Sequence, residues 1–208
     1  MVRLCDCPSP SASGGAVVIP VGSFEQHGPH LPLSTDTLIS EAVAAAVAKK
    51  LKAYVGPTIQ FGVSPEHMNF PGTITLAAST FKNVVSELVG SLRRHGFSEI
   101  MLVNGHGGNN KPLGELACEV KVVNLTSLIK PYDHAGEVET SLMMHLHPKL
   151  VVKDSICEQQ FTWPGKMEWA DTKEFSESGV LGHPHKASKK KGKAIFDELV
   201  EKTLKELS

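Results

Sequence analysis

Hydrophobic and polar residues follow two different periods along the chain, which predicts strands separated by helices. The run Ala16–Val21 is apolar and rich in β-branched residues, and it ends at Gly22, as expected of a strand buried on both faces. Glu99–Val103 is a second strand of this kind. Residues 80–95 instead repeat apolar positions at helical spacing. The apolar positions of this helix are Phe81, Val84, Val85, Leu88, Val89 and Leu92.

A C-terminal helix and several shorter elements complete the prediction. The helix starts near Ser188, and its apolar stripe consists of Ile195, Phe196, Leu199, Val200, Thr203, Leu204 and Leu207. Another helix is expected over Thr37–Lys52, with Thr35 or Asp36 available as its N-cap. The remaining expected elements are strands at Tyr54–Phe61, Thr73–Leu76 and 120–125 and helices around 112–119 and at 137–147. Residues 153–185 are expected to be irregular.

This alternation of strands and helices predicts an α/β domain with a mostly parallel sheet. A length of 208 residues is typical of one domain, which we assign to residues 16–208. Residues 1–15 form a lead-in whose Pro, Ser and Gly residues favour flexibility. The loops that follow Val21, Phe61 and Val103 carry His and Asp side chains. Because ligands bind parallel sheets at the carboxyl ends of strands, we expect the functional site there.

Composition and charge narrow the class of protein. The formal net charge is −1, so the chain has no global attraction to nucleic acid or to an anionic membrane. Apolar stretches such as Ala42–Ala48 are far shorter than the ~20 residues of a membrane span, and the N-terminus has no secretory h-region. We expect a cytoplasmic protein with four reduced cysteines. Cys5-x-Cys7 could bind a soft metal, but no second pair completes a zinc site.

Histidine is the informative residue type. Five of the ten histidines lie in turn-like segments beside carboxylates, namely His27, His30, His67, His106 and His134. In an extended segment Glu25 and His27 point to the same side, and Asp36 follows after a proline-rich turn. This set suits a divalent ion, and the two oxygens of Asp36 could bridge two ions. The alternative is that Asp36 only caps a helix and His27 only stabilises a loop.

Two further clusters contain histidine. Residues 104–110 (Asn-Gly-His-Gly-Gly-Asn-Asn) follow a buried strand, and their glycines permit close backbone approach to His106. A phosphate-binding loop is the rival interpretation, but the P-loop Lys-Ser/Thr and the dinucleotide glycine spacing are both missing. In residues 133–141, His134 lies near Glu137 and Glu139 at a helix start. Glutamate at that position also complements a helix dipole without any further role.

Together the clusters resemble the creatininase (creatinine amidohydrolase) family. The family's stretches look like Glu-x-His-Gly-x-His-Leu-Pro…Thr-Asp, Asn-Gly-His-Gly-Gly-Asn and His-Ala-Gly-x-x-Glu-Thr-Ser, and all three occur here in order. Residues 66–73 and 179–184 also look like family segments, so the resemblance runs from about Val17 to the C-terminal helix. It implies a three-layer α/β/α domain, a binuclear centre of Zn, Mn or Fe, and ring-like homo-oligomers, often hexamers.

The resemblance also implies a set of metal ligands. One ion would be bound by Glu25, Asp36 and His106, and the second by His27 and the bridging Asp36. In creatininase proper a glutamate two residues after the histidine that matches His106 completes the second site, whereas this chain has Gly108. Glu139 matches a family glutamate and is the best replacement. The departure favours family branches with Gly-Gly in this loop over creatinine itself.

The chemistry of such a site can be stated from the residue types. Two divalent ions that share a carboxylate can hold a water, lower its pKa towards about 7, and let the resulting hydroxide attack an amide carbonyl. We assign His134 as general acid/base, because imidazole titrates near neutral pH; the alternative is a capping or ligand-orienting histidine. The residues expected around the substrate are His30, Glu66, His67 and Asp133. The alternatives are that His30 orients a ligand carboxylate and that Glu66 and His67 are purely structural. Tyr132, Trp163 and Trp169 could stack on a planar substrate or form oligomer contacts.

We therefore predict a metal-dependent hydrolase that cleaves a small-molecule C–N amide bond, in a formamide or a cyclic amide. A formamidopyrimidine-nucleotide deformylase is favoured, because the lysines near the last helix could meet a phosphate. These are Lys186, Lys189, Lys190, Lys191 and Lys193, and a solvated face is their other interpretation. The alternatives are creatininase proper, a precursor-peptide peptidase of the same family, or a non-catalytic metal- or nucleotide-binding module. A single-metal site, with Glu139 only a helix-start carboxylate, also stays open.

Overall fold

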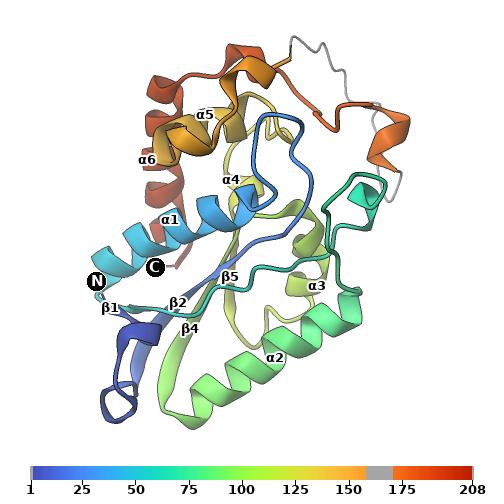
Figure 1. Cartoon of the computed structure of the whole chain (residues 1–208). Helices are drawn as coiled ribbons and strands as arrows, with labels where there is room; N and C mark the ends of the chain where they lie inside the picture. The colour runs from blue at the N-terminus through green and yellow to red at the C-terminus, as the bar shows by residue number, and fades with distance from the viewer. Residues whose placement is uncertain (1, 158–170, 208) are drawn as a thin grey trace.

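A five-stranded parallel sheet lies between two layers of helices in the computed structural model, which describes residues 2–157 and 171–207 (Figure 1). The strand order is β1-β3-β2-β4-β5. The strands are β1 (Val2–Arg3), β2 (Gly15–Val21), β3 (Tyr54–Val55), β4 (Phe97–Asn104) and β5 (Lys121–Asn124), and all their pairings are parallel. The predicted three-layer α/β/α architecture is confirmed.

Helices cover both faces of the sheet (Figure 1). The helices are α1 (Thr35–Leu51), α2 (Ala78–Arg94), α3 (Asn110–Gly114), α4 (Leu125–Leu128), α5 (Glu137–Leu146) and α6 (Lys189–Leu207). The 3₁₀ turns are Leu4–Asp6, Ser9–Ser11, Pro65–His67, Gly107–Asn109, Pro148–Leu150, Lys153–Ser155, Thr172–Glu174 and Pro184–Lys186. Among the described residues, no helix is long and apolar enough to cross a membrane.

The two central strands are apolar throughout because their side chains enter two different cores. Val18 of β2 and Met101 of β4 pack on α1, α5 and α6, whereas Ile19 and Leu102 pack against α2. All four side chains are at most 2% exposed. Alternation along a strand thus places consecutive residues in opposite cores. This explains why the predicted strand at Ala16–Val21 has no polar face.

Several shorter elements differ from the sequence-based expectation. The first residues of the expected lead-in pair with the sheet as β1. The strand expected over Tyr54–Phe61 ends at Val55, since Pro57 cannot donate to a ladder. Thr73–Leu76 contributes only an isolated bridge at Ile74, and α3 ends at Gly114 before a series of turns.

The start of α1 also differs. The N-cap is Ser34 rather than Thr35 or Asp36, and its side chain makes no capping hydrogen bond. Thr35 donates its hydroxyl to the carbonyl of Pro32 at 2.7 Å. The Asp36 side chain therefore does not cap the helix. Its buried carboxylate is available for contacts at the carboxyl edge of the sheet.

Candidate metal centre

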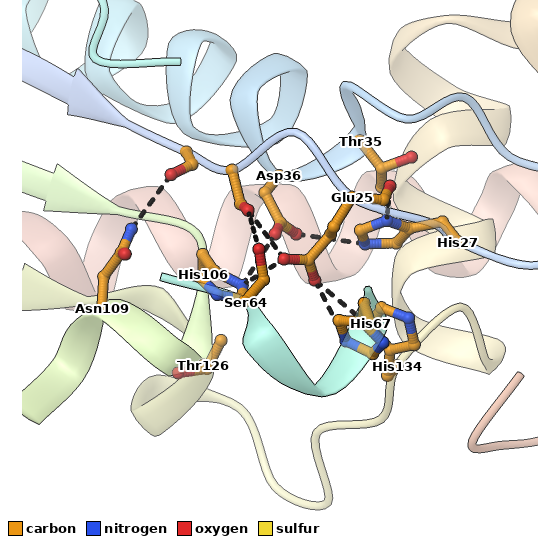
Figure 2. Close-up of polar contacts among 12 residues, drawn as sticks. Glu25, His27, Thr35, Asp36, Ser64, His67, His106, Asn109, Thr126 and His134 are labelled. Carbon is orange, nitrogen blue, oxygen red and sulfur yellow. Dashed lines mark hydrogen bonds and ion pairs between the residues drawn. The ribbon is translucent and has the colours of Figure 1, made fainter. Parts of the chain in front are cut away.

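Asp36 lies at the centre of a buried cluster of carboxylates and imidazoles. Its Oδ1 is 3.2 Å from Nε2 of His27, and its Oδ2 is 3.1 Å from Nδ1 of His106. Figure 2 shows the Asp36 carboxylate between these two rings. All three side chains are at most 5% exposed. The two oxygens of one carboxylate thus divide the cluster into two halves, as the sequence-based hypothesis of a bridging aspartate requires.

The first half, which we call the Glu25 half, consists of Glu25, His106 and Oδ2 of Asp36. Nδ1 of His106 is 3.2 Å from Oε2 of Glu25, and Ser23 donates its hydroxyl to that same oxygen at 2.7 Å. Nε2 of His106 is 2.9 Å from the carbonyl of Val63. A nitrogen that faces a carbonyl carries the proton, so the lone pair of Nδ1 points towards the carboxylates, as in metal-ligating histidines.

The second half, which we call the Glu139 half, consists of His27, Glu139 and Oδ1 of Asp36. Nε2 of His27 is 3.5 Å from Oε2 of Glu139, and the backbone N–H of Ala135 donates to that oxygen at 2.6 Å. Nδ1 of His27 is 3.2 Å from the carbonyl of Glu25, so Nε2 is the nitrogen that would offer its lone pair to an ion. Glu139 is 2% exposed, although it lies on a helix start where a glutamate is ordinarily solvated.

The donor set of this cluster fits divalent cations. Oε1 of Glu25, Nε2 of His27 and Oδ2 of Asp36 are buried, and apart from the ion-pair contacts within the cluster they have no hydrogen-bond partner in the part of the chain that the structure describes. Unpaired buried polar atoms are costly, and carboxylate oxygens with imidazole nitrogens are ligands for Zn, Mn and Fe. Three groups of ligand atoms each lie within 4.8 Å of one another: those of Glu25, His27 and Asp36, those of His27, His134 and Glu139, and those of Glu25, His67 and His134.

The electrostatics of the cluster lead to the same conclusion. Burial opposes the charged imidazolium, but Asp36 and Glu139 still raise the pKa of His27 well above its ordinary value. Burial likewise opposes ionisation of Asp36, yet His27 and His106 lower the pKa of that carboxyl. The carboxylates therefore create a strongly negative buried environment that attracts positive charge, whether from protons or from cations.

His134 borders both halves and is held by a residue that the sequence analysis missed. Its ring stacks on His67 with the centroids 4.4 Å apart, and its Nδ1 is 3.8 Å from Oε1 of Glu25. Nε2 of Gln26 is 2.9 Å from Nε2 of His134 and 3.0 Å from Nδ1 of His67. Burial and the neighbouring His67 and His27 lower the pKa of His134 well below its ordinary value.

The orientation of the Gln26 amide is fixed from both ends. Its Oε1 accepts the N–H of Gly28 at 2.9 Å, and its Nε2 donates to the carbonyl of Gly179 at 3.0 Å. Gly179 has φ +80°, and a Cβ there would lie 1.9 Å from Oε1 of Gln26. The signal for Gln26 was its position between Glu25 and His27, together with the family-like segment at residues 179–184.

A cavity of about 300 Å³ opens beside the cluster. Three of the predicted substrate residues line it, namely Glu66, His67 and Asp133. Asp133 also accepts the N–H of Val138 at 3.2 Å, and burial raises the pKa of its carboxyl to about 7. Oε2 of Glu66 is buried without a hydrogen-bond partner among the described residues, and burial raises the pKa of that carboxyl.

His30 differs from its expected place at the substrate. It is fully buried, lies outside the cavity lining, and contacts the hydroxyl of Thr140 through Nε2 at 2.8 Å. Thr140 follows Glu139, so His30 packs behind the Glu139 half. Tyr132 lines the cavity as expected, whereas Trp163 and Trp169 lie outside the described residues.

The lysines near α6 do not reach the cavity. Nζ of Lys191 contacts Glu137 and the carbonyl of Lys186, and Lys193 pairs with Asp197. None of the five lysines lines the cavity. They form a solvated face, so the phosphate argument for a deformylase loses its structural support.

Gly108 has no room for a side chain. A Cβ at this position would lie 2.1 Å from the carbonyl oxygen of Val63 and 2.5 Å from Nε2 of His106. The contact with Val63 involves backbone, so it cannot be relieved by a rotamer change. A glutamate at this position would therefore require the Val63 and His106 loops to move apart.

The chain is similar in sequence and in fold to proteins of one known family. Residues 9–207 match the family model for creatininase, described as creatinine amidohydrolase. The chain is 36% identical to the mycofactocin precursor peptide peptidase of Mycolicibacterium smegmatis, over 88% of this chain and 81% of that protein, and 29% identical to the creatinine amidohydrolase of Pseudomonas putida, over 91% and 88%. A solved structure of manganese creatininase superimposes with a TM-score of 0.82 at 28% identity, over 94% of this chain and 90% of that chain.

Proposed function

This chain belongs to the creatininase family of metal-dependent amidohydrolases, and on that premise we propose that it hydrolyses an amide bond of a precursor peptide. The main support for a peptide substrate is the charge of the side chains that line the cavity. Among the described residues that line the cavity there is no lysine or arginine, whereas Glu66 and Asp133 add carboxylates beyond those of the metal cluster. A phosphorylated substrate would find no cationic side chain there to pair with.

The similarity to known relatives supports the same choice. The chain is more similar to the mycofactocin precursor peptide peptidase than to the creatinine amidohydrolase, at 36% against 29% identity. Position 108 also has no room for the glutamate that creatininase proper would place there. A small-molecule amide, which the sequence alone favoured, is therefore the second choice.

The proposal includes two divalent ions. Glu25, Asp36 and His106 would hold one of them, and His27, Asp36 and Glu139 would hold the other. When bound, such ions polarise a carbonyl oxygen and make water nucleophilic near neutral pH. Zinc, manganese and iron all suit this donor set.

Two residues of the chain would then act on the substrate and its protons, and a third would position one of them. His134 borders both halves of the cluster, so its imidazole can take a proton during attack and return it to the departing amine. Gln26 holds the ring in place through Nε2 at 2.9 Å. Glu66 lines the cavity, and its Oε2 has no partner among the described residues, so its carboxylate can accept an N–H group of the peptide.

The test begins with metal content and continues with substrates. Protein purified without chelator or affinity-bound nickel would be analysed by elemental mass spectrometry, and we expect about two equivalents of metal per chain. The loaded protein would then be incubated with a peptide library, with creatinine and with formamides, and the products would be identified by mass spectrometry. Variant His134→Ala would serve as the inactive control.

The possible results separate the alternatives. Cleavage of peptides that depends on added metal supports the proposal. Turnover of only formamides or creatinine would overturn the peptide assignment and leave the metal centre intact. Failure to take up zinc or manganese would overturn the assignment as a metal-dependent hydrolase and favour the binding-module hypothesis.

A further inference from the structure

Tyr132 lines the cavity, and the function proposed above leaves its hydroxyl without a role. The hydroxyl oxygen is buried and has no hydrogen-bond partner within the described ranges. Tyr54, the other tyrosine of the chain, donates its hydroxyl to the carbonyl of Ser11. Because an unpaired buried hydroxyl is costly, we expect it to find an acceptor among the polar groups that line the same cavity.

Carboxylates line the same cavity as this hydroxyl. Burial raises the pKa of Tyr132, and the carboxylates of Glu139, Asp36 and Asp133 add to this effect. A tyrosine hydroxyl is protonated at neutral pH in any case and can act as a hydrogen-bond donor. Each of the three carboxylates is a candidate acceptor, and their existing contacts separate them.

Two of these carboxylates are already committed. Both oxygens of Asp133 accept the N–H of Val138, at 3.2 and 3.3 Å. Both oxygens of Asp36 face imidazoles, at 3.2 Å from His27 and 3.1 Å from His106. Each oxygen of these two carboxylates therefore already faces a nitrogen partner.

Glu139 differs from these two carboxylates. Only its Oε2 is engaged, by the N–H of Ala135 at 2.6 Å and by His27 at 3.5 Å. Its Oε1 has no partner among the described residues and is left for a further donor.

We propose that Tyr132 is a positioning residue whose hydroxyl donates to the carboxylate of Glu139 and orients that carboxylate for the ion of the Glu139 half. Hydrogen bonds to ligand carboxylates fix their orientation, and their loss typically weakens metal binding by about 10- to 100-fold. The effect should be confined to the Glu139 half, because both carboxylate and imidazole of the Glu25 half have partners of their own. This inference rests on the proposed binuclear centre but not on the peptide substrate.

The test is a zinc titration of the chelator-treated full chain, followed by competition with a chromogenic chelator. In Tyr132→Phe we expect one of the two zinc ions to bind about 10- to 100-fold more weakly, while the affinity for the other stays within about twofold. Tyr54→Phe is the matched control, since it removes the same oxygen far from the cluster, and it should bind both ions as the parent does. Thermal melting of each metal-free variant checks that the fold is retained.

A second variant shows whether the effect passes through Glu139. Glu139→Ala should by itself weaken the same ion, and adding Tyr132→Phe to it should cause no further loss. Additive losses, or unchanged zinc affinities in Tyr132→Phe, would overturn the proposal. Loss of turnover in Tyr132→Phe at unchanged affinity for both ions would also overturn it and would assign the hydroxyl to the substrate. Failure of the peptide assay would leave the zinc titration unaffected, so the two proposals fail separately.

Discussion

The two halves of the metal cluster are supported in different ways. In the Glu25 half the ligands follow the neighbouring strands β2 and β4, and both have fixed partners, Ser23 for Glu25 and Val63 for His106. In the Glu139 half the carboxylate comes from helix α5, and the Tyr132 hydroxyl beside it is unpaired among the described residues. Because paired strands hold their ends in place, we expect the Glu25 half to be the better ordered of the two before metal binds. We therefore expect tighter metal binding in the Glu25 half.

The largest effect is expected from the residue that the halves share. Asp36→Asn removes the charge that faces both imidazoles, so both ions should be lost and activity should fall by more than about 10³-fold. Elemental analysis of the purified variant measures the first effect, and a peptide assay the second. Asp197→Asn, in an exposed pair with Lys193, is the control. Two equivalents of metal bound to Asp36→Asn would show that Asp36 is not a bridge.

A loss of activity without loss of metal is expected at His134. His134→Ala should lower kcat by about 10²- to 10⁴-fold, the usual contribution of general acid–base catalysis, and keep two ions. Elemental analysis and steady-state kinetics check both statements. His95→Ala, at the end of α2, should change neither. Metal loss in His134→Ala would identify His134 as a ligand instead, which its place in two ligand sets makes a serious alternative.

The difference between the halves can be tested directly. Glu139→Gln should retain one ion tightly, and excess metal should restore part of its activity. Glu25→Gln removes a ligand from the preorganised half, so we expect it to lose the tighter ion and to recover less. Stepwise dialysis against a chelator, with metal counted at each step, compares the variants. Equal release from both halves would refute the difference that the hydrogen bonds predict.

The smallest effect is expected on the cavity wall. Glu66→Gln should raise KM by about tenfold through loss of a charge-assisted hydrogen bond to substrate, with a smaller change in kcat and unchanged metal content. Glu137→Gln, which loses only a contact with Lys191 at the surface, is the control. A fall in kcat at constant KM would instead place Glu66 in the reaction itself.

The sequence predicted well where the signal was local. The apolar runs of β2 and β4 and the stripe of α2 are periodic patterns, and the structure has these elements within a few residues of the predicted bounds. The prediction was poorer for β3 and α3, where Pro57 and Gly114 end elements that preference alone would extend. The sequence indicated residues such as Glu25, His27, Asp36 and His106 because carboxylates and imidazoles in glycine-rich loops are unusual.

Contacts between residues that are distant in the chain could not be predicted from local patterns. Gln26 reaches His67 and His134, which are distant in the chain, and His30 is directed away from the cavity although it lies only three residues from His27. Tyr132 was expected to stack on a substrate or to form an oligomer contact, whereas its notable feature is a hydroxyl without a hydrogen-bond partner among the described residues. These properties depend on how loops pack.

The sequence by itself determined the α/β class, the strand and helix order and the chemical types gathered at one sheet edge, because periodicity and residue chemistry act over short stretches of chain. Only the tertiary structure decided which oxygen of Asp36 faces which imidazole, that Glu139 is buried while Glu137 pairs with Lys191, and that the lysines near α6 lie away from the cavity. Distances between loops depend on strand register and helix packing, and these are set by the two cores as a whole.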